Sequence, residues 1–318
     1  METIWLLVLG GLFAGWFALD GFSLGVGMLL PYLGGRPDHR RTAVTAFGPF
    51  FLANEVWLLA AVTVLTAAFP RLEADLFAAC YPLLVTILIA WITRDAAVWL
   101  RSRRGGDGWR SGWDAVLTIS STVVAATWGL LLANVAQGLP TGGGAKPWWA
   151  LFDGGALLSG CAVALLVALH SAAFLAVRAT GDVADRARRV ARSLALPAAG
   201  LLAAATLAVT VLGSAVPRPM WTLGILLAGI AAAALAGRLT ATGQTRAAFA
   251  ATLGGVVAPV LAVGAGLAPR LLAGVAPAAS LRLLATLVLP ILAAVLLAQV
   301  WLWWAFRHRV HERSVTFF

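Results

Sequence analysis

Charged residues are scarce in this chain. Only 11% of its 318 residues are Asp, Glu, Lys or Arg, whereas 61% are hydrophobic. A water-soluble domain carries about 25% charged residues, so this composition excludes an ordinary soluble protein. The sequence therefore predicts an all-α, polytopic membrane protein in which residues 1–318 form a single integral-membrane domain.

Cysteine and histidine are rare as well. Cys80 and Cys161 lie in apolar runs without a CxxC or metal-binding spacing, so we expect buried, inert thiols. Of the four histidines, only His170 falls within an apolar run, and we interpret it as a hydrogen-bonded side chain at a helix interface. The chain lacks a P-loop, a GxGxxG motif, a zinc signature and a nucleophile with a matching base. We expect it to carry no catalytic residue and to bind no metal or cofactor by itself.

Long apolar runs are what the sequence has in abundance. A spanning helix needs about 20 apolar residues, and nine runs meet this requirement. Their approximate limits are 3–31, 46–69, 75–99, 114–137, 151–177, 194–214, 220–237, 247–268 and 283–306. An odd number of spans places the two termini on opposite sides of the membrane.

Arginine is distributed unevenly among the connections between these runs. With the N-terminus outside, the inner segments carry most of the basic residues, as the positive-inside rule requires. These are Arg36, Arg40, Arg41, Arg101, Arg103, Arg104, Arg110, Arg178, Arg186, Arg188, Arg189, Arg192, Arg238, Arg246, Arg307, Arg309 and Arg313. The outer segments carry only Arg71, Lys146, Arg218, Arg270 and Arg282. We therefore expect the N-terminus outside and the C-terminus in the cytoplasm.

Two acidic residues, Asp20 and Glu55, lie inside the first two apolar runs. An ionisable group in a spanning helix is costly and usually marks a pathway or a pairing site. On neighbouring antiparallel helices both carboxyl groups come to lie about 15 Å from the inner surface, at a rise of about 1.5 Å per residue. Ser23 shares a helix face with Asp20, and Asn54 is expected to donate a hydrogen bond to a carboxylate.

This arrangement has two interpretations. The first is a proton or cation relay fed from the cytoplasm, with Asp20, Ser23, Asn54 and Glu55 as the candidate residues. The second is a pair of buried acids, each paired with an arginine or a helix terminus, that only locks the helices together. Around Asp20, the small residues Gly21, Gly25 and Gly27 favour close approach of another helix.

Several short motifs are more specific than the composition. Residues 19–28 (LDGFSLGVGM), Leu30-Pro31, Gly48-Pro49, residues 54–58 (NEVWL) and residues 68–70 (AFP) form the strongest set. Matches farther along the chain are Arg94 and Arg101, Asn134 with residues 138–140 (GLP), His170 with the segment to Arg189, and Phe306-Arg307. With these motifs the chain resembles subunit II of the cytochrome bd-type quinol oxidases over most of its length.

The resemblance implies a function as the haem-free second subunit of a quinol:oxygen oxidoreductase in the bacterial cytoplasmic membrane. Subunit I would then be the partner that holds the b- and d-type haems and uses quinol. This chain would stabilise subunit I and contribute to proton and oxygen access, and small single-span accessory subunits are further partners of this kind of complex. Residues expected at subunit interfaces or in packing are Gly21, Gly25, Gly27, Trp57, His170, Arg94 and Arg101.

The sequence departs from the family pattern at three positions. Ser23, Leu52 and Trp99 stand where the resemblance implies acidic residues. The proton path is therefore either rerouted through the remaining polar residues or weakened. Two other functions remain open at this point: a stand-alone transporter coupled to protons or cations, and a non-catalytic assembly subunit.

Overall fold

The computed structural model describes residues 1–33, 36–140, 142–212, 220–311 and 314. In this part of the chain the regular structure is helical, and the only extended pairing is an isolated bridge between Ala179 and Val310. Nine helices among the described residues are long and apolar enough to cross a membrane. The predicted all-α class and the predicted number of spans are thereby confirmed.

The nine spanning helices are separated by short connections. They are α1 (Glu2–Leu33), α3 (Phe51–Ala68), α4 (Pro70–Leu100), α5 (Asp107–Gln137), α6 (Gly154–Arg178), α7 (Gly181–Leu212), α8 (Met220–Ala241), α9 (Thr245–Ala273) and α10 (Ala278–Ala305). A short helix, α2 (Pro37–Phe47), follows α1, and a 3-10 helix, η1 (Trp148–Phe152), precedes α6.

Several helices begin or end five or more residues away from the predicted limits, and two of these differences have identifiable reasons. The second span begins at Phe51 rather than at residue 46, because the chain turns at residues 48–50 and separates α2 from α3. Pro49 lies in this turn, where its missing N–H disfavours a continuous helix. The sixth span begins at Gly181 rather than at residue 194, because the segment 181–193 continues the helix and is rich in Arg and Ala, both good helix formers.

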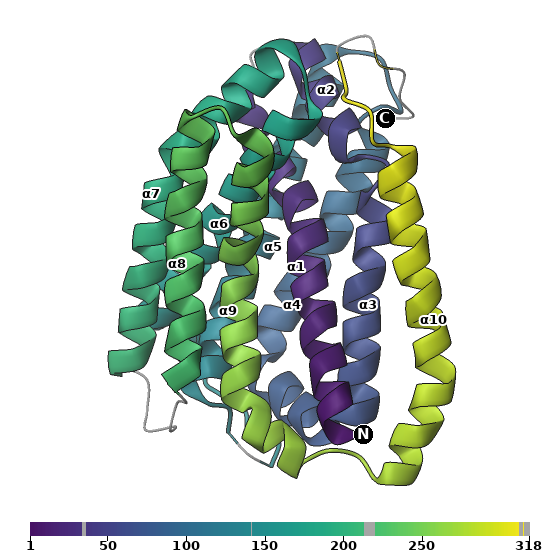
Figure 1. The fold of residues 1–318 in the computed structure, drawn as a ribbon, viewed down its shortest axis with the longest axis vertical. Coiled ribbons are helices and arrows are strands. Elements are labelled where there is room, and N and C mark those ends of the chain that lie inside the picture. The colour runs from purple at the N-terminus through teal and green to yellow at the C-terminus, as the bar shows by residue number, and fades with distance from the viewer. Residues whose placement is uncertain (34–35, 141, 213–219, 312–313, 315–318) are drawn as a thin grey trace.

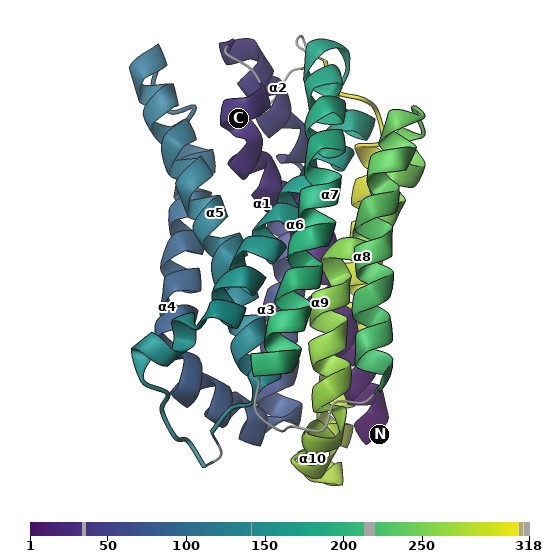
Figure 2. The same ribbon diagram turned by 90° about the vertical axis from the view of Figure 1, so that its left-hand side faces the viewer.

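The helices form an upright bundle with α1 at its centre. α1 packs against α3, α5, α6 and α9, while α7 and α8 lie on one side and α10 stands at the opposite edge beside α3 (Figure 1). A view from the side shows α4 and α5 at the edge away from α8 (Figure 2). The N-terminus lies at one end of the bundle, and α2 and the end of α10 lie at the other (Figure 1).

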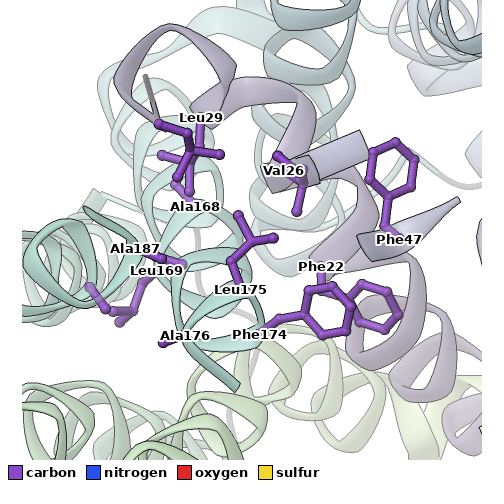
Figure 3. Packing of buried hydrophobic residues seen from close by; sticks show 14 of the residues in the cluster. Phe22, Val26, Leu29, Phe47, Ala168, Leu169, Phe174, Leu175, Ala176 and Ala187 are labelled. Atoms are coloured by element: carbon purple, nitrogen blue, oxygen red, sulfur yellow. The ribbon is translucent and has the colours of Figure 1, made fainter. Parts of the chain in front are cut away.

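Aromatic and aliphatic side chains fill the contact between α1, α2 and α6. Phe22 of α1 stacks on Phe174 of α6, with ring centroids 4.1 Å apart, and Phe47 of α2 lies near them (Figure 3). In a membrane the surrounding lipid is as apolar as these side chains, so close packing rather than transfer from water stabilises the contact. α1 is held in place by this fit.

Two glycines of α1 permit the closest helix approaches. A Cβ atom on Gly25 would overlap Ser171 Oγ and the Val167 carbonyl of α6, and one on Gly27 would overlap Ser121 Oγ of α5. Gly21 is different, because a Cβ there would lie 3.7 Å from Val256, an ordinary contact distance. Gly25 and Gly27 thus lie at helix contacts within this chain, whereas Gly21 has room for a methyl group.

We predict that Gly25→Ala destabilises the protein by about 1–3 kcal/mol, the usual cost of overpacking. The added methyl group would push α6 away from α1. Gly10→Ala is the matched control, because nothing lies within 4 Å of a Cβ at Gly10 in the same helix, and removing a glycine from a helix interior is favourable. Thermal unfolding of the purified protein would distinguish them. Equal melting temperatures for the two variants would contradict the close approach.

Candidate functional site

A single buried arginine joins the two acids of the first spans. The side chain of Arg94, on α4, is 0% exposed. Its Nη2 lies 3.3 Å from Asp20 Oδ1, and its Nη1 lies 3.1 Å from Glu55 Oε1. The guanidinium therefore binds α1 and α3 at once and fixes their depth relative to α4.

A third carboxyl group completes this cluster. Asp95 Oδ1 lies 3.1 Å from Arg94 Nη1, and the indole Nε1 of Trp91 donates a hydrogen bond to Glu55 Oε1 at 3.1 Å. Sequence reasoning missed Asp95 because it lies close to the end of its span. The adjacent pair Arg94-Asp95 inside an apolar run was the signal that could have identified it. We call Asp20, Glu55, Arg94 and Asp95 the acid cluster.

Ser23 lies within the acid cluster, whereas Asn54 lies beside it. The Ser23 hydroxyl accepts a hydrogen bond from Arg94 Nη2 at 2.8 Å and donates to Asp20. Asn54 donates to the Leu19 carbonyl at 2.8 Å instead of to a carboxylate. The expectation that Asn54 donates to a carboxylate is therefore wrong. Its carbonyl oxygen accepts a hydrogen bond from Gln299 Nε2 of α10 at 3.1 Å.

The acid cluster holds more carboxyl groups than cations. Arginine keeps its proton in proteins, so ionisation of all three acids would leave two uncompensated negative charges among buried residues. Isolated buried charge is costly. The cluster can relieve this cost by holding a proton on one carboxyl group or another while the guanidinium stays charged. This chemistry is that of a site that takes up and releases protons.

Exposure increases stepwise across the three acids. The side chain of Asp20 is 0% exposed, that of Glu55 is 12% exposed and that of Asp95 is 26% exposed. All three contact the same guanidinium. The carboxyl groups thus form a short series from the interior of the bundle to the outer surface of α4.

Two of the three positions that depart from the family pattern lie outside the acid cluster. Leu52 is 51% exposed and Trp99 is 42% exposed. Phe51 of α3 and Trp99 of α4 contact each other, with ring centroids 6.0 Å apart. An acidic side chain at either position would lie at the surface formed by α3 and α4.

His170 connects three helices. Its Nε2 lies 2.9 Å from the Ala18 carbonyl of α1, and its Nδ1 lies 2.8 Å from Thr252 Oγ1 of α9. The ring also stacks on Phe249, at a centroid distance of 4.9 Å. Both ring nitrogens are engaged in these contacts. Among the described residues, no group of three His, Cys, Asp or Glu side chains is arranged to hold a metal ion.

A second buried ion pair lies towards the arginine-rich end of the bundle. Arg101 Nε lies 2.5 Å from Asp114 Oδ1, and Arg40 Nη1 lies 3.1 Å from Asp114 Oδ2. These contacts tie α2 and the end of α4 to α5. Arg101 and Asp114 are both buried, so this ion triad positions helices within the chain.

α10 is attached to the bundle by a polar contact. Gln299 binds Asn54, and its Oε1 lies 3.4 Å from the Trp57 indole nitrogen. The Trp57 ring in turn crosses α1 at Gly15, where a Cβ atom would overlap it. Sequence reasoning missed Gln299, although it is a lone amide in a long apolar run.

Of the two cysteines, Cys80 is buried as expected, but Cys161 is exposed on the surface of α6.

Comparisons with known proteins agree on one family. The sequence model for cytochrome bd terminal oxidase subunit II matches residues 1–306. Cytochrome bd ubiquinol oxidase subunit 2 of Bacillus subtilis is 29% identical over 343 residues, which cover 100% of this chain and 99% of that protein. Cytochrome bd-I ubiquinol oxidase subunit 2 of Escherichia coli K12 is 30% identical over 62% of this chain and 54% of that protein. The structure of bd oxidase from Geobacillus thermodenitrificans has a similar fold, with a TM-score of 0.58 and 13% identity over 96% of each chain.

We predict that Arg94→Gln destabilises the protein by about 3–5 kcal/mol, the cost of breaking a buried ion pair by removing one partner. Asp20 would be left buried without a cation. Adding Asp20→Asn should recover part of this loss, because the two substitutions affect the same contact. The measurement is thermal unfolding of the single and double variants. Additive losses would show that Arg94 and Asp20 are not coupled.

Proposed function

The chain belongs to the family of cytochrome bd terminal oxidase subunit II, and we propose from this its place in the working enzyme. It is the second subunit of a quinol oxidase and acts together with a haem-bearing subunit I. The haems supply the oxygen chemistry on that partner. His170, the one histidine within an apolar run, is not available as a haem ligand, because both of its ring nitrogens are engaged in hydrogen bonds.

We propose further that the complex uses quinol, that its haems are of the b and d types, and that small single-span subunits associate with it. It lies in the bacterial cytoplasmic membrane. The end of the bundle with α2 and the arginine-rich connections faces the cytoplasm, and the N-terminus faces outward, because basic residues favour the cytoplasmic side.

Within this complex the acid cluster moves protons. The observation that carries this role is the series of carboxyl groups on one guanidinium, graded from the buried Asp20 to the partly exposed Asp95. A proton that arrives at one acid can pass to the next because Arg94 holds the three groups within a few ångströms. Ser23 links Arg94 to Asp20 with a hydroxyl that both accepts and donates.

The series of carboxyl groups in the acid cluster ends at the surface formed by α3 and α4. Asp95 is the most exposed acid of the cluster, and exposed Leu52 and Trp99 lie on the same two helices. We propose that subunit I contacts the chain at this surface. Protons that the partner releases or consumes then have a short route to or from the acid cluster. Glu55 then lies between the interior and the partner.

We predict that Asp20→Asn and Glu55→Gln each slow quinol-driven oxygen consumption about 100-fold, the lower end of the usual contribution of a positioned acid or base. Each variant keeps the shape of the side chain but removes a proton carrier. The haem absorption spectrum should remain, because the haems are held by subunit I and each substitution keeps the shape of the side chain. Oxygen uptake and the reduced spectrum of the same preparation are the measurements.

Glu73→Gln is the matched control for these variants. Glu73 lies in the first turn of α4, at the opposite end of the helix from Arg94, so oxygen uptake should be unchanged. Unchanged turnover in Asp20→Asn and Glu55→Gln would refute the relay and leave the cluster as a lock between helices. Loss of the haem spectrum in both variants would likewise assign them to assembly rather than proton movement.

We also predict that the tagged protein, extracted from its native membrane in mild detergent, copurifies with a haem-bearing subunit. The large apolar surfaces of α4 and α10 are suited to association within the membrane. The measurements are the absorption spectrum and the mass of the purified particle. A native particle that contains this chain alone and no haem would refute the proposed function.

A further inference from the structure

An apolar cavity lies at the end of the bundle opposite α2. It has a volume of about 250 Å³, is partly open, and is lined by α5, α6, α7, α8 and α9. Its wall is formed mainly by aliphatic side chains, among them Leu132, Val163, Ala205 and Ala262. It is distant in sequence and in the fold from the acid cluster, and the proposed function makes no use of it.

A second cavity adjoins the first. It has a volume of about 310 Å³ and lies between the beginning of α4 and the end of α9. Leu267 and Arg270 line both cavities. Ligand sites usually occupy roughly 300–1,000 Å³, so the two neighbouring spaces on either side of Leu267 and Arg270 together reach the size needed for an extended ligand.

The junction of the two cavities is basic. Arg71 and Arg270 both line the second cavity. The stem of Arg71 runs alongside Gly274, where its Cδ would lie 3.4 Å from an added Cβ, and Gly274 follows Arg270 by one turn. Asp75 is the one acid in the lining, and its Oδ1 accepts a hydrogen bond from the Gly143 amide at 3.1 Å.

The two arginines outnumber the one acid at this junction. Among the ion pairs between described residues, none involves Arg71 or Arg270. Both side chains are exposed. Two cations beside an apolar space are complementary to a molecule with an anionic head and a long apolar tail.

We propose that the two neighbouring cavities together bind one anionic phospholipid. Its phosphate group would be held by the guanidinium groups of Arg71 and Arg270, since arginine binds phosphate through paired hydrogen bonds. An acyl chain would occupy the aliphatic cavity between α5 and α9. A quinone is less suitable, because its neutral headgroup gains little from two cations.

The test uses the purified complex, stripped of lipid in detergent and then titrated with phosphatidylglycerol. Thermal unfolding reports binding, because a ligand of the folded state raises the melting temperature. The double variant Arg71→Gln/Arg270→Gln should bind phosphatidylglycerol about tenfold more weakly or worse, as expected for the loss of charge-assisted hydrogen bonds. Ala262→Phe should weaken binding as well, because the ring would fill the space for the acyl chain.

Arg282→Gln is the matched control. Arg282 is an exposed arginine at the start of α10, at the same end of the bundle, and lines neither cavity. It should bind phosphatidylglycerol like the unmodified complex. The double variant Arg71→Gln/Arg270→Gln still tests the proposal if the complex with Ala262→Phe assembles poorly.

Three outcomes would overturn the proposal. One is equal affinity of the double variant and the Arg282→Gln control for phosphatidylglycerol. Another is stabilisation by inorganic phosphate alone to the same extent, which would assign the junction to a free anion. The third is a quinone, rather than a phospholipid, found by mass spectrometry of the unstripped complex and lost on Ala262→Phe.

Discussion

The buried guanidinium of Arg94 is the constraint on which the arrangement of the first spans depends. A cation in a spanning helix must find a counter-charge within the protein, and Arg94 finds it on α1 and α3 simultaneously. α1 is thereby held against α3 and α4 on one side. Its glycines meet α5 and α6 on the other. The central position of α1 follows from these two requirements together.

The departures from the family pattern have different consequences once the positions are known. Position 23 lies inside the acid cluster, where the serine links Arg94 and Asp20 by hydrogen bonds and carries no charge, unlike the acid that the resemblance implies there. Positions 52 and 99 lie at the surface of α3 and α4. Their replacement by Leu and Trp alters that surface and leaves the contacts of Arg94 intact. A cluster with fewer acids has less uncompensated charge, so the remaining three carboxyl groups are more easily accommodated around one cation.

The spans could be predicted from the sequence because length and hydropathy are local properties. The break between α2 and α3 could not, since residues 46–50 and the end of α2 are as apolar as α3, and only the turn at Pro49 separates the two helices. Asp20 and Glu55 were identifiable as buried acids within apolar runs. Their shared partner was not, because Arg94 is distant in sequence and its side chain could equally reach the membrane surface. Gln299 was missed for the same reason, since its partner Asn54 lies more than 200 residues away.

Polar contacts between distant segments set the register of a bundle whose surroundings are as apolar as its core. Close packing holds α1 against its neighbours, and a hydrogen bond or ion pair adds a contact that can be made at one position only. Arg94 with Asp20, His170 with the Ala18 carbonyl, and Gln299 with Asn54 each supply such a position. Their energies differ in scale. A hydrogen bond within a membrane contributes about 0.6 kcal/mol on average, whereas breaking a buried ion pair costs about 3–5 kcal/mol. The acid cluster is therefore the contact whose loss would disturb the position of α1 most, and the histidine and glutamine contacts align α6, α9 and α10 with α1.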